Sequence, residues 1–244
     1  MIQITLGLIL GLIQFISSEP QYSTSLDFFI KHAGFHRELQ YRLGFGGFMR
    51  QSCEFILVQN LPAAVFVNTD QLNDLKRLKK IETYVPVYMD VEVPAIKSFH
   101  FQMYIFGDIK KAVNISLPIH FRYQQPTDMK FVRVEIHSPT IYFRCESESS
   151  PELKPSKGQK EEEFPCRTSS NITDYDRIKE IDVCLWEELE FINDPTTLSV
   201  LIPAGNIYSY KFVLPITIVI SWLGCFYIVY IVLKKTKNLN KKIL

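Results

Sequence analysis

The chain has 244 residues, of which 47% are hydrophobic and 22% charged, and its formal net charge is +1 at pH 7. This near-neutral total hides an asymmetry, because residues 19–211 hold all 26 acids but 22 of the 27 bases, the other five being lysines after residue 233. A mildly acidic main segment gives no reason to expect nucleic acid as a partner. Its roughly 190 residues are enough for one hydrophobic core.

The N-terminal stretch predicts a secretory signal peptide. Residues 1–16 are almost entirely apolar, and the small residues Ser17 and Ser18 follow them. A short apolar core with small residues at its end is typical of such peptides, so we expect residues 1–18 to be removed after Ser18. The first residues hold no Lys or Arg, which leaves an uncleaved anchor as the alternative. In both cases residues 19–211 are expected in the lumen of the endoplasmic reticulum.

The main segment alternates apolar and polar residues, which predicts strands with one buried face. Five stretches alternate in this way, and three shorter apolar runs also resemble strands: 39–45, 87–93, 99–105, 117–123 and 132–136, then 53–58, 141–143 and 198–202. Turn residues separate them, including Pro62, Pro94 and Gly107-Asp108. We therefore predict one luminal all-β domain, an antiparallel β-sandwich over residues 19–211.

One short helix is expected to interrupt the strands. Leu72, Leu75 and Leu78 recur at helical spacing, and Thr69 or Asp70 is suited to cap the helix N-terminus. We expect this helix to pack across an end of the sandwich.

Four luminal cysteines predict disulfides, because their number is even and the compartment is oxidising. They are Cys53, Cys145, Cys166 and Cys184. Their spacing does not suit zinc, and sequence alone leaves all three pairings open. Residues 147–163 are rich in Ser, Glu, Pro and Lys and predict an exposed loop, which a bridge between Cys145 and Cys166 would close.

Two triplets predict N-glycosylation. Asn114-Ile115-Ser116 and Asn171-Ile172-Thr173 match the acceptor pattern, and both fall in the segment expected in the lumen. Asn114 precedes a predicted strand, whereas Asn171 lies in a polar stretch.

The motif search gives no catalytic, cofactor-binding or metal site. G-x-S-x-G and H-E-x-x-H are absent from the sequence. The pair Asp174 and Asp176 could hold a metal and a sugar phosphate, but it lies in a polar stretch with no strand leading into it. We interpret these two acids as solvated loop residues and expect no enzyme.

The C-terminal region predicts a transmembrane helix over residues 212–233. Residues 213–233 are uncharged and would reach roughly 31 Å as a helix, enough to cross a bilayer core. Lysines dominate the tail 234–244, which predicts a cytoplasmic tail and a single-pass type I topology. Lys241 and Lys242, fourth and third from the end, resemble a dilysine signal for retrieval to the endoplasmic reticulum.

One face of this helix carries small residues. Thr217, Ser221 and Cys225 are four apart and therefore share a face, which small side chains make suitable for close packing against another helix. We treat this face as a candidate contact with a partner helix.

Several blocks of the main segment, taken in order, resemble the phosphatidylinositol-glycan biosynthesis class X family, whose yeast counterpart is Pbn1. The most specific are Gly-Phe-His-Arg, which begins at Gly34, and Leu-Pro-Ile-His-Phe-Arg-Tyr, which begins at Leu117. The others lie at 53–67, 144–145, 165–166, 184–186 and 201–205. The resemblance covers residues 34–205 together with the single C-terminal span.

The resemblance implies a non-catalytic subunit of GPI mannosyltransferase I in the endoplasmic reticulum membrane. That complex transfers the first mannose from dolichol-phosphate-mannose to glucosaminyl-acyl-phosphatidylinositol during GPI-anchor biosynthesis. The implied partner is its multi-spanning catalytic subunit, the class M protein, which the class X protein binds and stabilises. This expectation agrees with a luminal module that shows no reactive constellation.

Three alternatives remain open. A p24-like cargo receptor between the endoplasmic reticulum and the Golgi would share the signal peptide, sandwich, span and dilysine tail. It would carry a coiled coil before the span, whereas residues 171–211 show no sustained heptads. An enzyme using Asp174 and Asp176 and a general chaperone with many clients are the other two.

Overall fold

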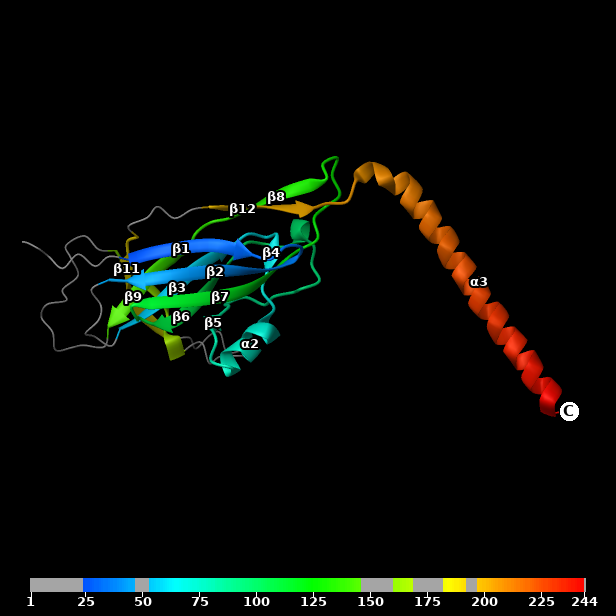
Figure 1. The fold of residues 1–244 in the computed structure, drawn as a ribbon, viewed down its shortest axis with the longest axis horizontal. Helices are drawn as coiled ribbons and strands as arrows, with labels where there is room; N and C mark the ends of the chain where they lie inside the picture. Colours follow the sequence, from blue (N-terminus) through cyan, green and yellow to red (C-terminus); the bar gives the residue numbers. More distant parts are fainter. Residues whose placement is uncertain (1–23, 47–52, 146–159, 169–181, 192–196, 244) are drawn as a thin grey trace, which may run out of the picture. The chain divides into compact units, whose positions relative to one another are not determined.

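The structure is a computed structural model that describes residues 24–46, 53–145, 160–168, 182–191 and 197–243. The described chain forms two compact units, one from residues up to 123 and 133–202, the other from 124–132 and 203 onward. The first unit is a β-sandwich and the second holds the long C-terminal helix (Figure 1). The strands are β1 (Thr24–Lys31), β2 (His36–Phe45), β3 (Cys53–Leu61), β4 (Val65–Phe66), β5 (Glu82–Tyr84), β6 (Phe101–Asp108), β7 (Ala112–Phe121), β8 (Phe131–Ile136), β9 (Thr140–Cys145), β10 (Glu161–Pro165), β11 (Val183–Leu189) and β12 (Leu198–Pro203). The helices are α2 (Thr69–Arg77), α3 (Tyr210–Ile243) and the 3-10 turns η1 (Ala95–Lys97) and η4 (Ile207–Ser209).

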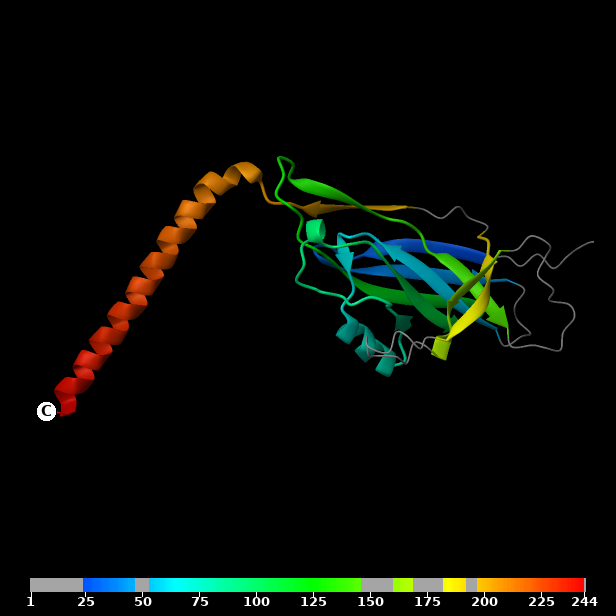
Figure 2. The same cartoon turned by 180° about the vertical axis from the view of Figure 1, so that it is seen from behind.

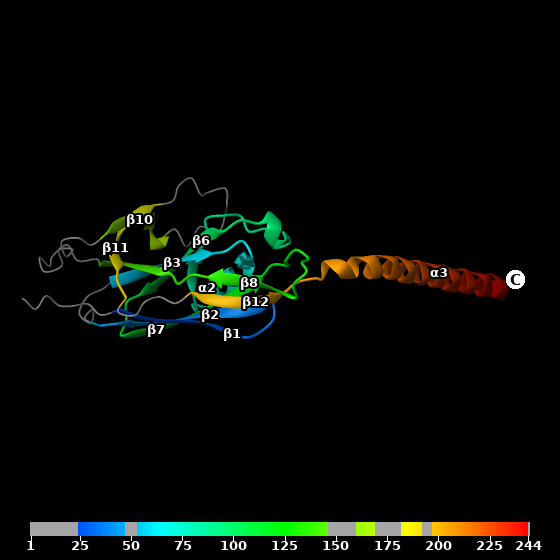
Figure 3. The same ribbon diagram turned by 90° about the horizontal axis from the view of Figure 1, so that it is seen from above.

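The described strands form a four-stranded and a six-stranded sheet, here called the smaller and the larger sheet, and β12 and β8 form a separate two-stranded sheet. The smaller sheet has the order β1-β2-β7-β4 and the larger has the order β10-β11-β9-β3-β6-β5. Neighbouring strands in both sheets are antiparallel. Figure 3 shows the two layers, with β1, β2 and β7 in one and β3, β6 and β11 in the other. The predicted all-β antiparallel sandwich with one apolar C-terminal helix is confirmed.

The main core lies between the sheets and follows from the alternation in the sequence. In β2, Leu39, Tyr41, Leu43 and Phe45 are buried and face the core, while the residues between them are more exposed. Strands β1 and β7 contribute their own alternate residues in register, so that Leu26 lies opposite Leu43. The larger sheet contributes buried residues to the same core: Phe55, Leu57, Met103, Ile105, Ile141 and Phe143.

One polar pair crosses this core. Tyr41 on the smaller sheet donates a hydrogen bond of 2.9 Å to the amide oxygen of Gln59 on the larger sheet. The amide nitrogen of Gln59 in turn donates to the carbonyls of Asn60 and His137. Both residues are fully buried, and burial raises the pKa of Tyr41. Because a buried polar group without a partner is costly, this pair favours one alignment of the two sheets.

The short helix forms where expected, but its cap was predicted wrongly. Asn68 is the N-cap, and its side chain accepts hydrogen bonds from the backbone N–H groups of Asp70 and Gln71. Thr69 and Asp70 lie inside the first turn. Leu72 is buried and Leu75 packs on the core, whereas Leu78 caps the C-terminus and is 62% exposed. The helix lies against β5, at one edge of the larger sheet (Figures 1 and 2).

The predicted strand over residues 87–93 is wrong, because a distant arginine binds its carbonyl groups. Arg122 donates from one nitrogen to the carbonyls of Asp90 and Val93, at 2.7 Å each. Its other terminal nitrogen contacts the sulfur of Met89, and the guanidinium lies 4.8 Å from the ring centre of Phe66. Carbonyl groups held in this way do not form a strand ladder, so the segment runs as an irregular loop with Met89 buried.

Two other expectations about strand limits change. The strand expected at 99–105 begins at Phe101, with Phe99 52% exposed, and the one expected at 117–123 is Ala112–Phe121, which leaves Tyr123 outside. The polar loop expected at 147–163 was wrong at its end, because residues 161–163 belong to β10. Residues 146–159 of that loop lie outside the described residues.

The second unit contains the apolar helix. The candidate span within the described residues is Ile207–Thr236, a 30-residue segment with mean hydropathy 2.4 over its most apolar window. It is long and apolar enough to cross a membrane and is wider than the predicted limits 212–233. Pro215 lies inside α3, beyond its first turn, so the helix lacks one backbone hydrogen bond at this residue.

Candidate functional site

Two disulfides link strands of the larger sheet. Cys53 of β3 bonds Cys145 of β9, at directly opposed positions in the ladder. Cys166, which follows β10, bonds Cys184 of β11. The bridge between Cys145 and Cys166 that would have closed the polar loop is therefore not formed. Each end of that loop is instead fixed to a strand of the sheet.

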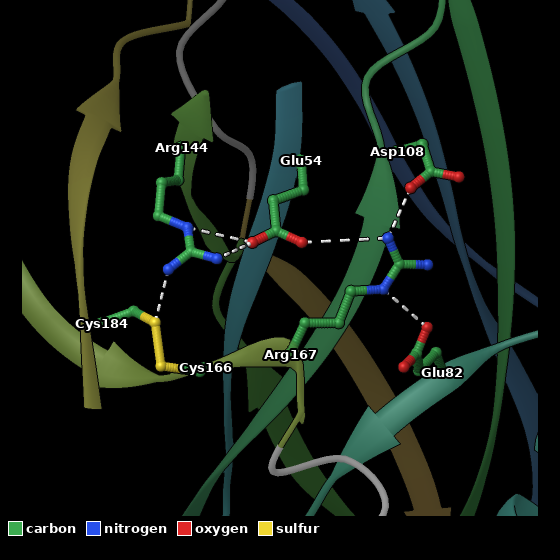
Figure 4. Close-up of polar contacts among 7 residues, drawn as sticks. All are labelled: Glu54, Glu82, Asp108, Arg144, Cys166, Arg167 and Cys184. Atoms are coloured by element: carbon green, nitrogen blue, oxygen red, sulfur yellow. Dashed lines mark hydrogen bonds and ion pairs between the residues drawn. A yellow bond between two sulfur atoms is a disulfide. The ribbon is translucent and has the colours of Figure 1, made fainter. Parts of the chain in front are cut away.

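An arginine-carboxylate network lies beside the second disulfide (Figure 4). Arg144 of β9 binds Glu54 of β3, with nitrogen–oxygen distances of 2.8 and 3.1 Å, and also contacts the sulfur of Cys184. Arg167, next to Cys166, donates to Glu82 of β5 at 2.9 Å and to Asp108 at the end of β6. Its guanidinium also lies 3.9 Å from Glu54. These contacts connect residues from five strands of one sheet, β3, β5, β6, β9 and β11, to the chain that follows β10.

The charge balance of this network is local. Burial disfavours the charge on Arg167, but hydrogen bonds from its guanidinium to Asp108 and Glu82 leave its pKa above the ordinary value. Each carboxylate is held by an arginine, an arrangement that suits ion pairing better than proton transfer. Among the described residues, no group of three or more His, Cys, Asp or Glu side chains could hold a metal ion.

Beneath the network lies a second apolar cluster, on the face of the larger sheet that points away from the main core. Its buried members are Ile56, Val58, Tyr84, Tyr104, Phe106, Tyr142 and Trp186. The guanidinium of Arg144 lies 5.5 Å from the ring centre of Trp186 and so joins the cluster to the network. The sequence does not predict this cluster, because strands of a sheet that is covered on both faces show no alternation of apolar and polar residues.

A strap made of residues 160–168 covers part of this cluster. Phe164 in the strap lies 4.6 Å from Tyr142 and 5.9 Å from Tyr104, measured between ring centres. Tyr142 donates to the carboxylate of Glu162, and burial together with this hydrogen bond raises its pKa. The Cys166–Cys184 bond and Arg167 fix the end of the strap. The strap, which contains β10 at the edge of the larger sheet, therefore covers part of the outer face of that sheet.

The smaller sheet presents a polar outer face that carries one predicted glycosylation site. Asn114 is exposed on β7, opposite Arg42 of β2. The hydroxyl of Ser116, in the same triplet, donates to Glu38 and accepts from Gln40. Asn171 lies outside the described residues, as do Asp174 and Asp176.

Thr217, Ser221 and Cys225, the predicted contact face, lie in α3, and the two hydroxyl groups bond within the helix. Thr217 donates to the carbonyl of Val213, and Ser221 donates to the carbonyl of Thr217. Cys225 is a free thiol on the same face, and a Cβ added at Gly224 would meet open space. The face therefore offers close packing more than new hydrogen bonds. The signal peptide 1–18 and the side chains of Lys241 and Lys242 lie outside the described part of the chain.

Among the described residues, these features define a class: a disulfide-linked antiparallel β-sandwich followed by one apolar helix long enough to cross a membrane. The model of the PIG-X / PBN1 family matches residues 32–233, which include most of the sandwich and the apolar part of the helix. The chain belongs to this family.

Two curated relatives are similar to the chain over most of its length. A protein of Rattus norvegicus called "GPI alpha-1,4-mannosyltransferase I, stabilizing subunit" is 24% identical over 198 residues, which cover 78% of this chain and 74% of the relative. A Mus musculus protein of the same name is 23% identical over 198 residues, covering 78% and 73%.

Proposed function

We propose that this chain is the non-catalytic stabilising subunit of GPI mannosyltransferase I. The observation that carries the proposal is the family match over residues 32–233, because it includes the sandwich and the span together. The printed names of the rat and mouse relatives support the stabilising role. The reaction served would be transfer of the first mannose from dolichol-phosphate-mannose to glucosaminyl-acyl-phosphatidylinositol, carried out by a multi-spanning class M partner.

The proposed mechanism is stabilisation by binding. A chain held in the same membrane as its partner meets it at a high effective concentration. If it binds the folded partner and not the unfolded one, it stabilises the folded form by about 2.7 kcal/mol when its effective concentration is 100 times the dissociation constant. The described architecture suits this role, because Glu54, Glu82 and Asp108 form ion pairs within the sandwich.

The proposed topology is single-pass type I in the endoplasmic reticulum membrane. Residues 19–211 would lie in the lumen after removal of residues 1–18, and 234–244 in the cytoplasm with Lys241 and Lys242 as the retrieval signal. The two disulfides support an oxidising compartment for the sandwich. The lysines that follow the span support a cytoplasmic tail.

Within the membrane, we assign partner contact to the face of Thr217, Ser221 and Cys225. Since both hydroxyl groups bond their own helix, the contact would depend on how closely another helix can approach. Ser221→Leu should weaken co-purification of the catalytic partner, whereas Ile220→Leu, which changes a neighbouring position conservatively, should leave it unchanged.

The test of the function is loss of the chain in cells that display GPI-anchored proteins. The catalytic partner should fall in abundance first, and surface GPI-anchored proteins should fall with it. Normal partner levels with lost mannose transfer would contradict a stabilising role. Affinity purification in mild detergent should recover one multi-spanning mannosyltransferase, and its repeated absence would overturn the proposal.

The same experiment separates the alternatives. Full rescue by a variant with Asp174→Ala and Asp176→Ala would exclude an enzyme that uses those acids. A p24-like cargo receptor is disfavoured by the described residues before α3, because 198–209 form β12 and the 3-10 turn η4 where such a receptor has a coiled coil.

A further inference from the structure

The second unit contains a loop of residues 124–132 that is hydrogen-bonded to residues 204–207, just before the apolar helix α3. The backbone N–H of Thr127 donates to the carbonyl of Gly205 at 2.9 Å, and the N–H of Ile207 donates back to the carbonyl of Thr127 at 3.0 Å. A third bond joins Ala204 to Lys130. Figure 1 shows the loop, in green, beside the start of α3, in orange, and both belong to the same compact unit. Three backbone hydrogen bonds therefore hold the loop against the segment that leads into the helix.

Local hydrogen bonds also fix the conformation of each element. The hydroxyl of Thr127 accepts from the N–H of Met129 and donates to its carbonyl, which holds the tip of the loop. The side chain of Asn206 accepts from the N–H of Tyr208 at 2.8 Å and so caps η4. The side chains at the tip and on η4 are thus presented by a defined backbone.

Those side chains are large, apolar or aromatic, and exposed. Four of them form what we call the foot: Met129 is 68% exposed, Ile207 55%, Tyr208 69% and Tyr210 65%. Lys130 and Lys211 lie beside the foot in sequence and are also exposed. Exposed apolar side chains gathered around one short segment of a protein usually mark a contact surface.

Chain distance shows which contact the foot can reach. The candidate span begins at Ile207, and the uncharged run begins at Phe212, five residues later. Five residues of 3-10 and α-helix rise roughly 9 Å. The polar zone on each side of a bilayer core is about 5–7 Å thick, so a helix that crosses the membrane brings the foot to this zone.

We propose that the foot is a membrane-contact surface, which inserts Met129, Ile207, Tyr208 and Tyr210 into the headgroup layer on the N-terminal side of the span. Tyrosine suits this zone because its ring is apolar and its hydroxyl can remain hydrated. Lys130 and Lys211 can extend their amines to the phosphates while their aliphatic parts stay in the apolar region. The occupant is lipid rather than protein, because continuity with the span places the foot at the bilayer whatever other chain is bound.

The test uses the full-length chain, reconstituted alone in phosphatidylcholine vesicles. In a Cys225→Ser background, Met129→Cys and Ile207→Cys each supply one free thiol for an environment-sensitive fluorophore, since the other four cysteines form disulfides. Val229→Cys labels the span, and the fluorophore joined to glutathione in buffer gives the fully hydrated reference.

At Met129 and Ile207 we expect a blue-shifted emission and a reduced quenching by aqueous iodide. Lipids brominated near the glycerol backbone should quench these two labels more than lipids brominated near the chain ends, and the order should reverse at Val229. In the labelled Ile207→Cys protein, adding Met129→Asp should increase iodide quenching, whereas the matched Met129→Leu should not.

Labels that behave like the hydrated reference, with no quenching by brominated lipid, would overturn the proposal. So would labels that are hydrated in vesicles but become shielded when the mannosyltransferase partner is added, since the surface would then bind protein. A Val229 label that stays hydrated would overturn the membrane span and the foot together. None of these outcomes depends on mannose transfer, so the proposed function and the foot can fail separately.

Discussion

The two sheets of the sandwich treat their outer faces differently. Strands of the smaller sheet alternate buried and exposed residues, and their outer face carries exposed polar groups such as Asp27, Arg42 and Asn114. In the larger sheet, β3 and β6 are buried on both faces, because the strap and β11 cover the outer one. The two sheets therefore show that an apolar run without alternation can be an interior strand of an antiparallel sheet when other segments cover its outer face.

The largest effects are expected from the disulfides, both of which stabilise the covered sheet. Cys53→Ser together with Cys145→Ser opens a disulfide loop with a sequence separation of 92, which predicts a loss of about 4.5 kcal/mol in the free energy of unfolding. Removing the Cys166–Cys184 bond opens a loop with a separation of 18, which predicts a loss of about 3 kcal/mol. Denaturant unfolding in detergent measures both losses, with Cys225→Ser as the matched control.

The two losses should also differ in kind. Without the Cys166–Cys184 bond, limited proteolysis should cut within residues 160–168 before the rest of the sandwich. Equal protection of the strap in both double variants would contradict its dependence on this bond.

The next prediction uses two neighbours that point to opposite faces of β3. Ile56 lies in the covered outer cluster and Leu57 in the main core, and both are fully buried. Ile56→Ala and Leu57→Ala should each lower the free energy of unfolding by about 2–5 kcal/mol. On the exposed outer face of the smaller sheet, Asp27→Ala should change the free energy of unfolding by less than about 0.5 kcal/mol.

A small effect of Ile56→Ala, similar to that of Asp27→Ala, would show that the outer face is not covered in solution. The comparison is made by equilibrium unfolding under the same conditions for the three variants, so that any effect of the detergent cancels.

A smaller effect is expected at Arg167, whose side chain is 33% exposed. The side chains of its partners Glu82 and Asp108 are 26% and 55% exposed. Because exposed ion pairs are weak, Arg167→Ala should cost about 1–2 kcal/mol. Arg167→Lys should recover part of this loss, since lysine keeps the charge but cannot bind several carboxylates in a fork. Salt titration of unfolding is the measurement, and a loss that does not decrease at high salt would contradict an ionic role.

The contrast between the sheets also explains what could be predicted from sequence. The strands of the smaller sheet that were expected follow from alternation, because their outer face is wet: Leu39, Tyr41 and Leu43 identify β2 directly. Strand β10 was missed because three successive glutamates indicate a loop. Its position depends on Phe164 and on two residues beyond its end, Cys166 and Arg167.

Errors elsewhere have the same physical cause, which is contact between residues far apart in sequence. The alternation at 87–93 was overruled by Arg122, about thirty residues away. The bonds from Arg144 to Glu54 and from Arg167 to Glu82 join residues 90 and 85 apart, and no local pattern signals them. Helix α2 was predicted from the spacing of its leucines. Its N-cap depended on which of several suitable side chains reached the free backbone N–H groups, and that side chain is Asn68.

The smallest effect on stability is expected at Asn114, on the exposed outer face of the smaller sheet, where a glycan can be attached. In an Asn171→Gln background, Asn114→Gln should remove one glycan, seen as loss of a gel shift sensitive to endoglycosidase H. Ser116→Ala should do the same, while Ser116→Thr keeps the acceptor triplet and should keep the glycan. Since Asn114 is exposed, the free energy of unfolding of Asn114→Gln should change by less than about 0.5 kcal/mol. A glycan that is never attached at Asn114 would argue against a luminal and accessible smaller sheet, and would remove this difference between the two outer faces.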